Sequence, residues 1–330
     1  MRFLILSDLH LGAHPGVHHD GVAGQATHVI RKARLDHTAD VIVLNGDVFD
    51  NWAHPIDATP PDWDEILAQP EIQAFMTEIS QWKRSNVWYI KGNHDFDMGE
   101  LFNMSMFNKG MAYKQLWFEH GHRMDLFNAP DIKGRPYPFG YYITRVHTQG
   151  LHKKAPSLDP NIHHYTTSPA FLAKSEAFKG LTLPKMVLSV VALDAGVPMT
   201  AKIPMPDGST PTLDEVANDY GYLLADWAQA YGFEYAANAA LVSAEQMEWE
   251  AQEILKGAHK RVLVMGHSHK PETHYYGSFG GYVNDGAMCN SNPTWTRISY
   301  PDTGTDAVCI EQYKWLTGTD KPVATTWVKV

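Results

Sequence analysis

Short apolar runs that each end in the same kinds of polar residue constrain this chain more than any other feature. Runs of β-branched and large apolar residues bounded by glycine predict buried strands. The runs at residues 2–6, 41–44, 87–90, 116–118 and 261–265 lead into Asp8-Leu-His10, Gly46-Asp47, Gly92-Asn-His-Asp95, His120-Gly121 and Gly266-His-Ser-His269, respectively. The sequence therefore predicts five strands that present acidic, amide and imidazole side chains at their carboxyl ends.

Two helical patterns separate the first three predicted strands, at about residues 24–38 and 63–84. A strand, a crossover helix and a further strand form a unit that builds the parallel sheet of an α/β fold. Ligands of such sheets bind outside the carboxyl ends of the strands. The five polar clusters fall at these ends, so we expect them to form one site.

Residues 130–260 differ in character from the rest of the chain. They begin with loops rich in proline and glycine, and capping-box patterns begin two helices at Thr212 and Ser243. The apolar residues after Thr212 predict a helix that reaches Trp227. We expect a helical cap inserted into a single catalytic domain made of residues 1–129 and 261–330. Strand-like segments at 281–284, 294–299 and 307–313 predict a second sheet, formed largely by the last third of the chain.

The composition excludes several classes of protein. The chain has 330 residues and a net charge of −10, with enough length for one large or two ordinary domains. No apolar run approaches the roughly 18 residues of a membrane span. Cys289 and Cys309 are too few for a disulfide framework. We therefore expect a cytoplasmic protein without a broad nucleic-acid surface, although metal ions could still create a local anion site. The 18 histidines are the excess to explain.

The polar clusters carry atoms that suit metal ions. Asp8 and His10 are two residues apart at a strand end, so both side chains can point the same way. The same spacing separates His120 from His122 and His267 from His269. Each pair alone also fits an ordinary turn or cap. All five clusters in one chain point to metal binding, and glycines such as Gly46 let the backbone turn tightly beside an ion.

The set Asp8-Leu-His10, Gly46-Asp47-Val-Phe-Asp50, Gly92-Asn-His-Asp95, His120-Gly121 and Gly266-His-Ser-His269 resembles the five-motif signature of calcineurin-like metallophosphoesterases. The resemblance spans residues 8–269, and residues 130–260 match no part of it. It implies an α/β fold, a four-layer αββα sandwich of two mixed sheets, with two divalent metal ions. By this resemblance, the first ion is held by Asp8, His10, Asp47 and His269, and the second by Asn93, His120, His267 and the bridging Asp47.

The resemblance also implies a mechanism. A hydroxide that bridges the two ions attacks phosphorus in line with the leaving group. His94 would assist the leaving group as a proton donor, or neutralise charge on the phosphoryl group, and Asp95 would orient the His94 ring. Asp50 would hold a ligand in place rather than contact metal. The mixed oxygen and imidazole donors lead us to expect Mn²⁺, with iron or Zn²⁺ as alternatives.

Further side chains stay open between functional and structural roles. His122 could contact substrate or support a ligand, and Arg123 could bind a phosphate or pair with Asp125. Cys289 could be a soft metal ligand or a buried inert thiol. Residues that could line the cleft or set specificity from the cap are His18, His19, His54, Arg135, Tyr137, Arg145, His147, His152, His163 and His164.

We expect a hydrolase of phosphoric monoesters or diesters that acts on a small-molecule or nucleotide substrate. One alternative is a nucleotide phosphodiesterase or a pyrophosphohydrolase similar to those that cleave UDP-2,3-diacylglucosamine, because residues 7–12 and the large insertion resemble that group. Another is a metal-binding scaffold without turnover, as in the related retromer subunit. The intact set of ligands argues against the scaffold. Sequence leaves the natural substrate and the oligomeric state open.

Overall fold

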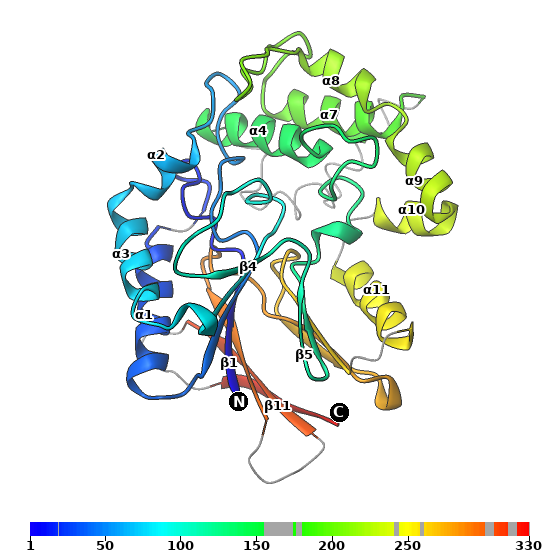
Figure 1. Cartoon of the computed structure of the whole chain (residues 1–330). Coiled ribbons are helices and arrows are strands. Elements are labelled where there is room, and N and C mark those ends of the chain that lie inside the picture. The colour runs from blue at the N-terminus through cyan, green and yellow to red at the C-terminus, as the bar shows by residue number, and fades with distance from the viewer. Residues whose placement is uncertain are drawn as a thin grey trace.

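The computed structural model describes residues 1–18, 20–154, 174–175, 180–240, 244–257, 261–300, 307–315 and 322–329. Within these residues, two β-sheets lie between layers of helices (Figure 1). In spatial order, the first sheet has β12 (Pro322–Lys329), β11 (Ala307–Lys314), β10 (Thr294–Ser299), β1 (Arg2–Leu6), β2 (Val41–Asn45), β3 (Val87–Ile90) and β4 (Ser105–Phe107). The second has β5 (Met111–Tyr113), β6 (Leu116–Phe118), β7 (Val262–Met265), β9 (Gly281–Asn284) and β8 (Glu272–Tyr275).

Both sheets contain parallel and antiparallel pairs. β1 is parallel to β2, and β2 is parallel to β3, as the crossover helices predicted. β6, β7 and β9 are parallel in the second sheet. The expectation that residues 294–299 and 307–313 join the second sheet is wrong. β10 instead pairs antiparallel with β1, Arg2 opposite Ser299, and β11 follows β10. An apolar run predicts a strand but does not say which sheet edge it will meet.

Apolar side chains fill three layers around the sheets. Between the sheets, Phe3 and Ile5 of β1 share a core with Phe118 and Val264. Helices α1 (Val22–Leu35) and α3 (Pro70–Ile79) cover the outer face of the first sheet, and α11 (Ala244–Gly257) covers the second. Burial on both faces explains why the strands read as continuous apolar runs. The predicted αββα order of layers is therefore confirmed.

The helix between β2 and β3 is interrupted. The sequence predicted one helix over residues 63–84, whereas the structure has α2 (Trp63–Leu67) followed by α3. Pro70 is the first residue of α3, where its missing N–H is tolerated, and this position starts a new helix rather than continuing the old one. The described part of the chain also has short 3₁₀ turns at η1 (Arg84–Asn86), η2 (His122–Met124) and η4 (Gly277–Phe279).

Apart from α11, the described helices of the insertion lie beyond the carboxyl ends of the central strands (Figure 1). Among the described residues these helices are α4 (Phe139–His152), α7 (Leu183–Asp194), α8 (Leu213–Asp219), α9 (Leu223–Tyr231) and α10 (Phe233–Ala239), and they share a separate apolar core. Thr212 forms the predicted capping box at α8, but the predicted helix to Trp227 is split into α8 and α9. Ser243 lies outside the described residues.

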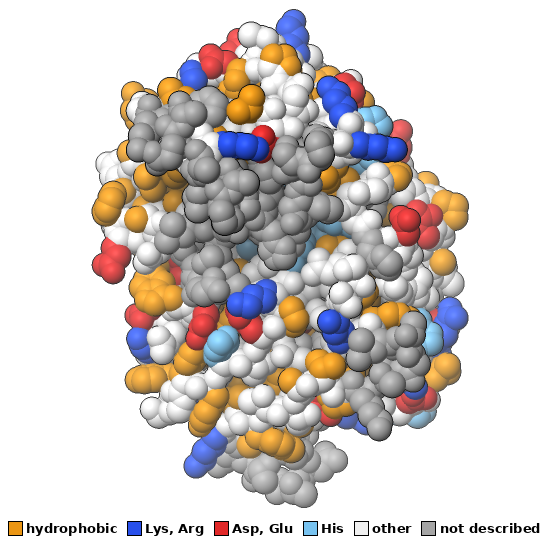
Figure 2. All heavy atoms as spheres, turned by 180° about the vertical axis from the view of Figure 1, so that it is seen from behind, with side chains coloured by type: hydrophobic (Ala, Val, Ile, Leu, Met, Phe, Trp, Pro, Cys, Tyr) orange, Lys and Arg blue, Asp and Glu red, His pale blue; other side chains and the backbone are white. Residues whose placement is uncertain are grey.

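The surface carries mixed charge. On the face in Figure 2, the acidic and basic side chains of the described residues are interspersed rather than gathered by sign. Among the described residues, no helix is both long enough and apolar enough to cross a membrane. Cys289 and Cys309 are buried and free.

Candidate metal centre

The predicted ligands lie at strand ends in a backbone conformation that is unusual for their residue types. Asp8, His10 and Asp47 have φ angles of 52°, 50° and 50°, and His267 and His269 have φ angles of 67° and 58°. This left-handed region costs a residue other than glycine about 1–3 kcal/mol, and such strain concentrates at functional sites. Strained backbone at five predicted ligands marks this group of loops as a candidate site.

Two glycines make room for these ligands. A Cβ atom at Gly92 would overlap Oδ1 of Asp47, and one at Gly46 would overlap the ring of His120. Gly46 also has a φ of 92°, which side-chain-bearing residues rarely adopt. Glycine at these positions therefore lets the backbone pass close to the side chains of two predicted ligands, Asp47 and His120.

Ligand-type atoms gather into neighbouring groups. Groups whose members lie within 4.8 Å of one another are Asp8, His10 and His269; His10, Asp47 and His94; and Asp47, His120 and His267. Nε2 of His269 lies 3.2 Å from Oδ1 of Asp8, and Nε2 of His120 lies 3.1 Å from Oδ2 of Asp47. Nε2 of His120 is also 3.8 Å from Oδ1 of Asp8. The structure thus brings residues from five strand ends, those of β1, β2, β3, β6 and β7, to one place.

Buried atoms without partners show that the site suits cations. Nε2 of His10 and Oδ1 of Asn93 are buried and have no hydrogen-bond partner among the described residues. Native proteins rarely leave such atoms unsatisfied unless water or an ion binds there. Carboxylate and amide oxygens with imidazole nitrogens are ligands for divalent transition metals. The residues present therefore fit the two ions that the sequence predicted.

The charge balance also favours cations. Burial would lower the pKa of His120, but the carboxylates of Asp47 and Asp8 raise it to about 10. Burial would raise the pKa of Asp8, yet His120 and His269 hold it well below its usual value. The two carboxylates therefore stay ionised at neutral pH and stabilise positive charge between them, as binding of divalent ions requires.

Asp50 contacts two of the imidazoles. Its Oδ2 lies 2.7 Å from Nδ1 of His10 and 2.9 Å from Nδ1 of His94. Its Oδ1 accepts hydrogen bonds from the backbone N–H groups of Trp52 and Ala53, at 2.7 and 2.9 Å. Burial would lower the pKa of His94, but Asp50 and Asp47 raise it. Asp50 is thus held by its own loop in a position that orients both rings.

Asp95 lies in a different place from the one that the sequence suggested. Its Oδ2 accepts hydrogen bonds from the backbone N–H of Val48 at 2.8 Å and from the hydroxyl of Tyr89 at 2.6 Å. These contacts tie the loops after β2 and β3 together. The expectation that Asp95 orients His94 is corrected, because the carboxylate beside the His94 ring is that of Asp50. Neighbours in sequence need not direct their side chains to the same point.

Asp125 supports a predicted ligand that the sequence did not connect with it. The sequence offered Asp125 as a partner for Arg123, which is exposed. In the structure, Oδ2 of Asp125 lies 3.1 Å from Nε2 of His267, a residue 142 positions away. His122 is buried, and its ring centroid lies 5.5 Å from that of His120. No local pattern could have revealed the contact between Asp125 and His267.

Trp52, in the loop after β2, lies between the cap and the candidate site. The ring centroid of Trp52 lies 4.6 Å from that of His94 and 5.6 Å from that of Tyr141 on α4. Arg145, also on α4, is fully buried and donates hydrogen bonds to the backbone carbonyls of Pro55 and Pro204, at 2.8 and 2.7 Å. Arg145 therefore fastens the loop after β2 to the cap, and Trp52 places this loop against His94.

Other cap side chains have partners of their own. Arg135 forms ion pairs with Asp131 and Asp219 at 2.8 and 2.9 Å. The ring of Tyr137 stacks on that of Tyr141, with centroids 4.3 Å apart. His147 is buried, and the ring centroid of His152 lies 4.9 Å from that of His14. His19, His163 and His164 lie outside the described residues.

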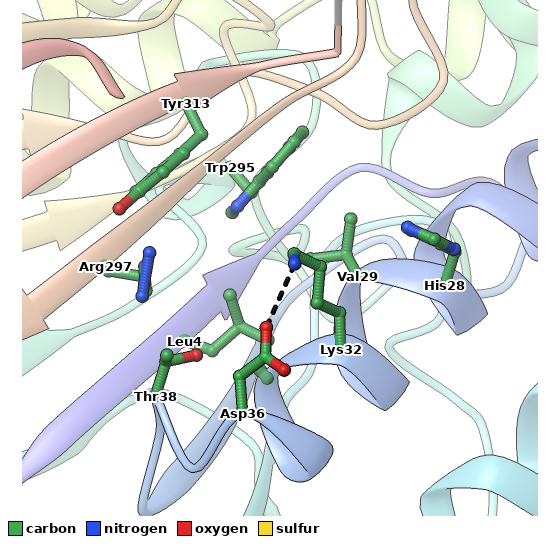
Figure 3. Close-up of a pocket in the computed structure, with 10 residues that line it drawn as sticks. Leu4, His28, Val29, Lys32, Asp36, Thr38, Trp295, Arg297 and Tyr313 are labelled. Carbon is green, nitrogen blue, oxygen red and sulfur yellow. Dashed lines mark hydrogen bonds and ion pairs between the residues drawn. The ribbon is translucent and has the colours of Figure 1, made fainter. Parts of the chain in front are cut away.

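A separate pocket lies between α1 and the strands β10 and β11 (Figure 3). Its volume is about 50 Å³. Lys32 forms an ion pair with Asp36 at 2.9 Å, and the guanidinium of Arg297 lies 4.5 Å from the ring centre of Tyr313. None of the predicted metal ligands lines this pocket. Small-molecule sites usually enclose about 300–1,000 Å³, so the pocket is no competitor to the metal centre.

Comparison of the chain with known protein families supports the interpretation of this group of residues as a metal centre. The family described as calcineurin-like phosphoesterase matches residues 1–294. Since this match spans most of the chain, the protein belongs to the calcineurin-like phosphoesterase family. It is therefore a metallophosphoesterase, an enzyme that hydrolyses phosphoric esters.

Solved structures that match this chain have low sequence identity to it. A dimetal phosphatase from Danio rerio is 10% identical with a TM-score of 0.41, and the match covers 100% of this chain and 98% of that one. A predicted phosphoesterase from Streptococcus pneumoniae TIGR4 is 11% identical with a TM-score of 0.36, covering 99% and 95%. Vps29 from Entamoeba histolytica, complexed with zinc, is 11% identical with a TM-score of 0.33, covering 99% and 97%. Among curated proteins, none matches.

Proposed function

We propose that this protein is a dinuclear hydrolase of phosphoric monoesters or diesters, with a small-molecule or nucleotide substrate. The observation that carries the proposal is the position of Asp47, which belongs to two of the ligand groups. A carboxylate shared between two groups can hold two ions close together, as two-metal sites for phosphoryl chemistry require.

The proposed assignment of ligands is the one that the family resemblance implies, and the groups support it in part, because Asn93 belongs to none of them. The first ion would be held by Asp8, His10, Asp47 and His269, and the second by Asp47, Asn93, His120 and His267. When bound, the two ions would supply Lewis-acid stabilisation of the phosphoryl oxygens and activation of water at neutral pH. Mn²⁺ is the ion that we propose, with iron or Zn²⁺ compatible with the same donors.

His94 is the residue that we assign to the leaving group. Its Nδ1 lies 2.9 Å from Asp50, so Nε2 is the nitrogen that can reach a substrate oxygen. Its backbone N–H donates a hydrogen bond to Oδ1 of Asp47 at 2.8 Å, which ties His94 to the shared carboxylate. Trp52 packs against the ring and limits its rotation. A general acid held in this way contributes about 10²–10⁴-fold to the rate.

The two parts of the chain would have different roles in catalysis. We propose that residues 1–129 and 261–330 form the catalytic domain and that residues 130–260 supply a cap that sets specificity. The apolar core of the cap includes Trp52 of the loop after β2, and Trp52 also packs against His94, so the cap lies next to the proposed proton donor. The helix α11 lies within residues 130–260 but packs against β7 and β9, as part of the catalytic layers.

The proposal is tested with two chromogenic esters. Purified protein, stripped with chelator and reloaded with Mn²⁺, is assayed against p-nitrophenyl phosphate and bis-p-nitrophenyl phosphate, and its metal content is measured. We expect hydrolysis that is lost on chelation and restored by Mn²⁺. Hydrolysis of neither ester by protein that demonstrably holds two ions would favour the metal-binding scaffold. A nucleoside diphosphate is assayed beside the two esters, and a strong preference for it would favour the pyrophosphohydrolase.

A further inference from the structure

A further group of ligand-type atoms lies beside the proposed centre and contains a sulfur. The ligand atoms of His10, His18 and Cys289 lie within 4.8 Å of one another. The ring centroids of His10 and His18 are 4.6 Å apart. Cys289 is 3% exposed, and its Sγ lies 3.9 Å from Nδ1 of His269. His18 and Cys289 belong to none of the five motifs, so the family signature gives them no role.

Both imidazoles of this group have a buried atom that is available to an ion. Nε2 of His10 and Nε2 of His18 are buried and have no hydrogen-bond partner among the described residues. His10 as a whole is 5% exposed. Buried nitrogen atoms in native proteins are normally satisfied by a donor, an acceptor, water or an ion. Because Nε2 of His10 is also the proposed ligand of the first ion, it is the unsatisfied Nε2 of His18, beside a buried thiol, that points to a further cation position.

His10 cannot serve this group and the first proposed ion together. Its Nδ1 lies 2.7 Å from Asp50, so Nε2 is the nitrogen that binds metal. The same Nε2 lies 4.0 Å from Oδ1 of Asp8 and 3.8 Å from Oδ2 of Asp47. One nitrogen lone pair binds one ion, so an ion held by His18 and Cys289 removes His10 from the side of Asp8 and Asp47.

We propose that Cys289, His18 and His10 form a position for a thiophilic divalent ion such as Zn²⁺, which competes for His10 with the ion of the catalytic centre. Thiolate and imidazole together bind Zn²⁺ in protein sites that keep an open position, whereas Mn²⁺ prefers carboxylate oxygen. On binding, the Cys289 thiol releases its proton to water and its sulfur bonds to the ion, with no change in oxidation state. Zn²⁺ in excess would thus inhibit the Mn²⁺ enzyme.

Cobalt absorption tests whether the sulfur binds metal. The full-length protein is stripped of metal and titrated with Co²⁺, and the thiolate-to-cobalt charge-transfer band in the near ultraviolet is followed. We expect the band in the wild type and in Cys309→Ser, which alters the other cysteine, and its loss in Cys289→Ser. His18→Gln changes a partly buried loop residue and should weaken Co²⁺ binding at this position at least about tenfold. A band that persists in Cys289→Ser, or no band in wild-type protein that holds Co²⁺, would overturn the proposal. If Cys289→Ser fails to fold, the Co²⁺ affinity of His18→Gln decides, and an affinity equal to that of the wild type would overturn the proposal.

Competition for His10 is a separate claim, because it rests on the proposed function. Zn²⁺ is added to the Mn²⁺-loaded enzyme, and hydrolysis of p-nitrophenyl phosphate is compared with and without Zn²⁺ within each variant. We expect half-inhibition of Cys289→Ser to need at least about tenfold more Zn²⁺ than half-inhibition of the wild type or Cys309→Ser. Equal sensitivity in all three overturns the competition. A wild type that hydrolyses no ester overturns the proposed function instead, while the cobalt spectrum still decides whether Cys289 and His18 bind metal.

Discussion

Oδ2 of Asp50 lies 2.9 Å from Nδ1 of His94 and, from the same oxygen, 2.7 Å from Nδ1 of His10. One carboxylate therefore positions both a proposed metal ligand and the proposed proton donor. Asp50→Asn keeps the shape but removes the charge. Since such supporting partners are worth about 10–100-fold in metal affinity or activity, we expect kcat and Mn²⁺ affinity both to fall by that factor.

Metal analysis and steady-state kinetics check this prediction, with Asp20→Asn as an exposed control on the loop after β1. The control should match the wild type in both measurements. Normal kcat and full metal content in Asp50→Asn would show that the contacts of Asp50 with His10 and His94 contribute to neither metal binding nor catalysis.

Asp47 should be the residue whose loss affects both ions. It lies in the group with His10 and His94 and in the group with His120 and His267. We expect Asp47→Asn to lose nearly all activity and to lower the content of both ions, because a single carboxylate serves two positions. Equilibrium dialysis followed by metal analysis measures the stoichiometry. An Asp47→Asn protein that still binds two ions tightly contradicts the bridging assignment.

His94 should matter for the chemical step and not for metal content. We expect His94→Asn to retain both ions and to lower kcat by about 10²–10⁴, the usual contribution of a general acid. A substrate with a better leaving group should recover much of the lost rate, since it needs less protonation. If His94→Asn protein instead purifies without metal, His94 is a ligand, as its nearness to His10 and Asp47 also permits.

The sequence predicted best where a local pattern determines the structure. β1 and β3 have the predicted bounds, because each is an apolar run buried on both faces. Each ligand motif follows its strand within a few residues, so strand prediction and motif position support each other. The groups around Asp8 and Asp47 could therefore be anticipated from chain order and from the rule that carboxyl ends of parallel strands meet.

The sequence predicted least where distant segments pack together. The carboxylate of Asp125 meets His267 across 142 positions, and Trp52 of the loop after β2 packs against His94 of the loop after β3. β10 was recognised as a strand but was assigned to the wrong sheet, since its apolar pattern suits either. Contacts of this kind depend on the fold as a whole and leave no periodic signal in the chain.

Gly92 should tolerate no side chain, although it lies in an ordinary loop. A Cβ atom there would overlap both Oδ1 and the backbone N of Asp47. We expect Gly92→Ala to displace the shared carboxylate and to lower metal affinity and kcat at least about tenfold. Gly99→Ala is the matched control, because its Cβ would meet nothing within 4 Å. Isothermal titration with Mn²⁺ measures both variants, and equal affinities would contradict the close approach.

Glu78 should link α1 to α3 in a pH-dependent way. It is 3% exposed, and its two oxygens each lie 2.9 Å from an arginine of α1, Arg31 and Arg34. Burial would raise the pKa of Glu78, but Arg34 and Arg31 hold it below the usual 4.5. A lowered pKa stabilises the fold above the unfolded-state value, and this stabilisation is lost as the pH falls through the folded-state value.

We therefore expect Glu78→Gln to lower the free energy of unfolding of metal-free protein by about 1–2 kcal/mol at neutral pH, since charged hydrogen bonds to a buried carboxylate are lost. The difference from the wild type should shrink between about pH 5 and pH 3, as the wild-type carboxylate takes up a proton. Urea denaturation at a series of pH values measures it. Glu71→Gln, an exposed change on the same helix, should cost little at any pH. A Glu78→Gln deficit that stays constant down to pH 3 would mean that shape, and not charge, is what the two arginines recognise.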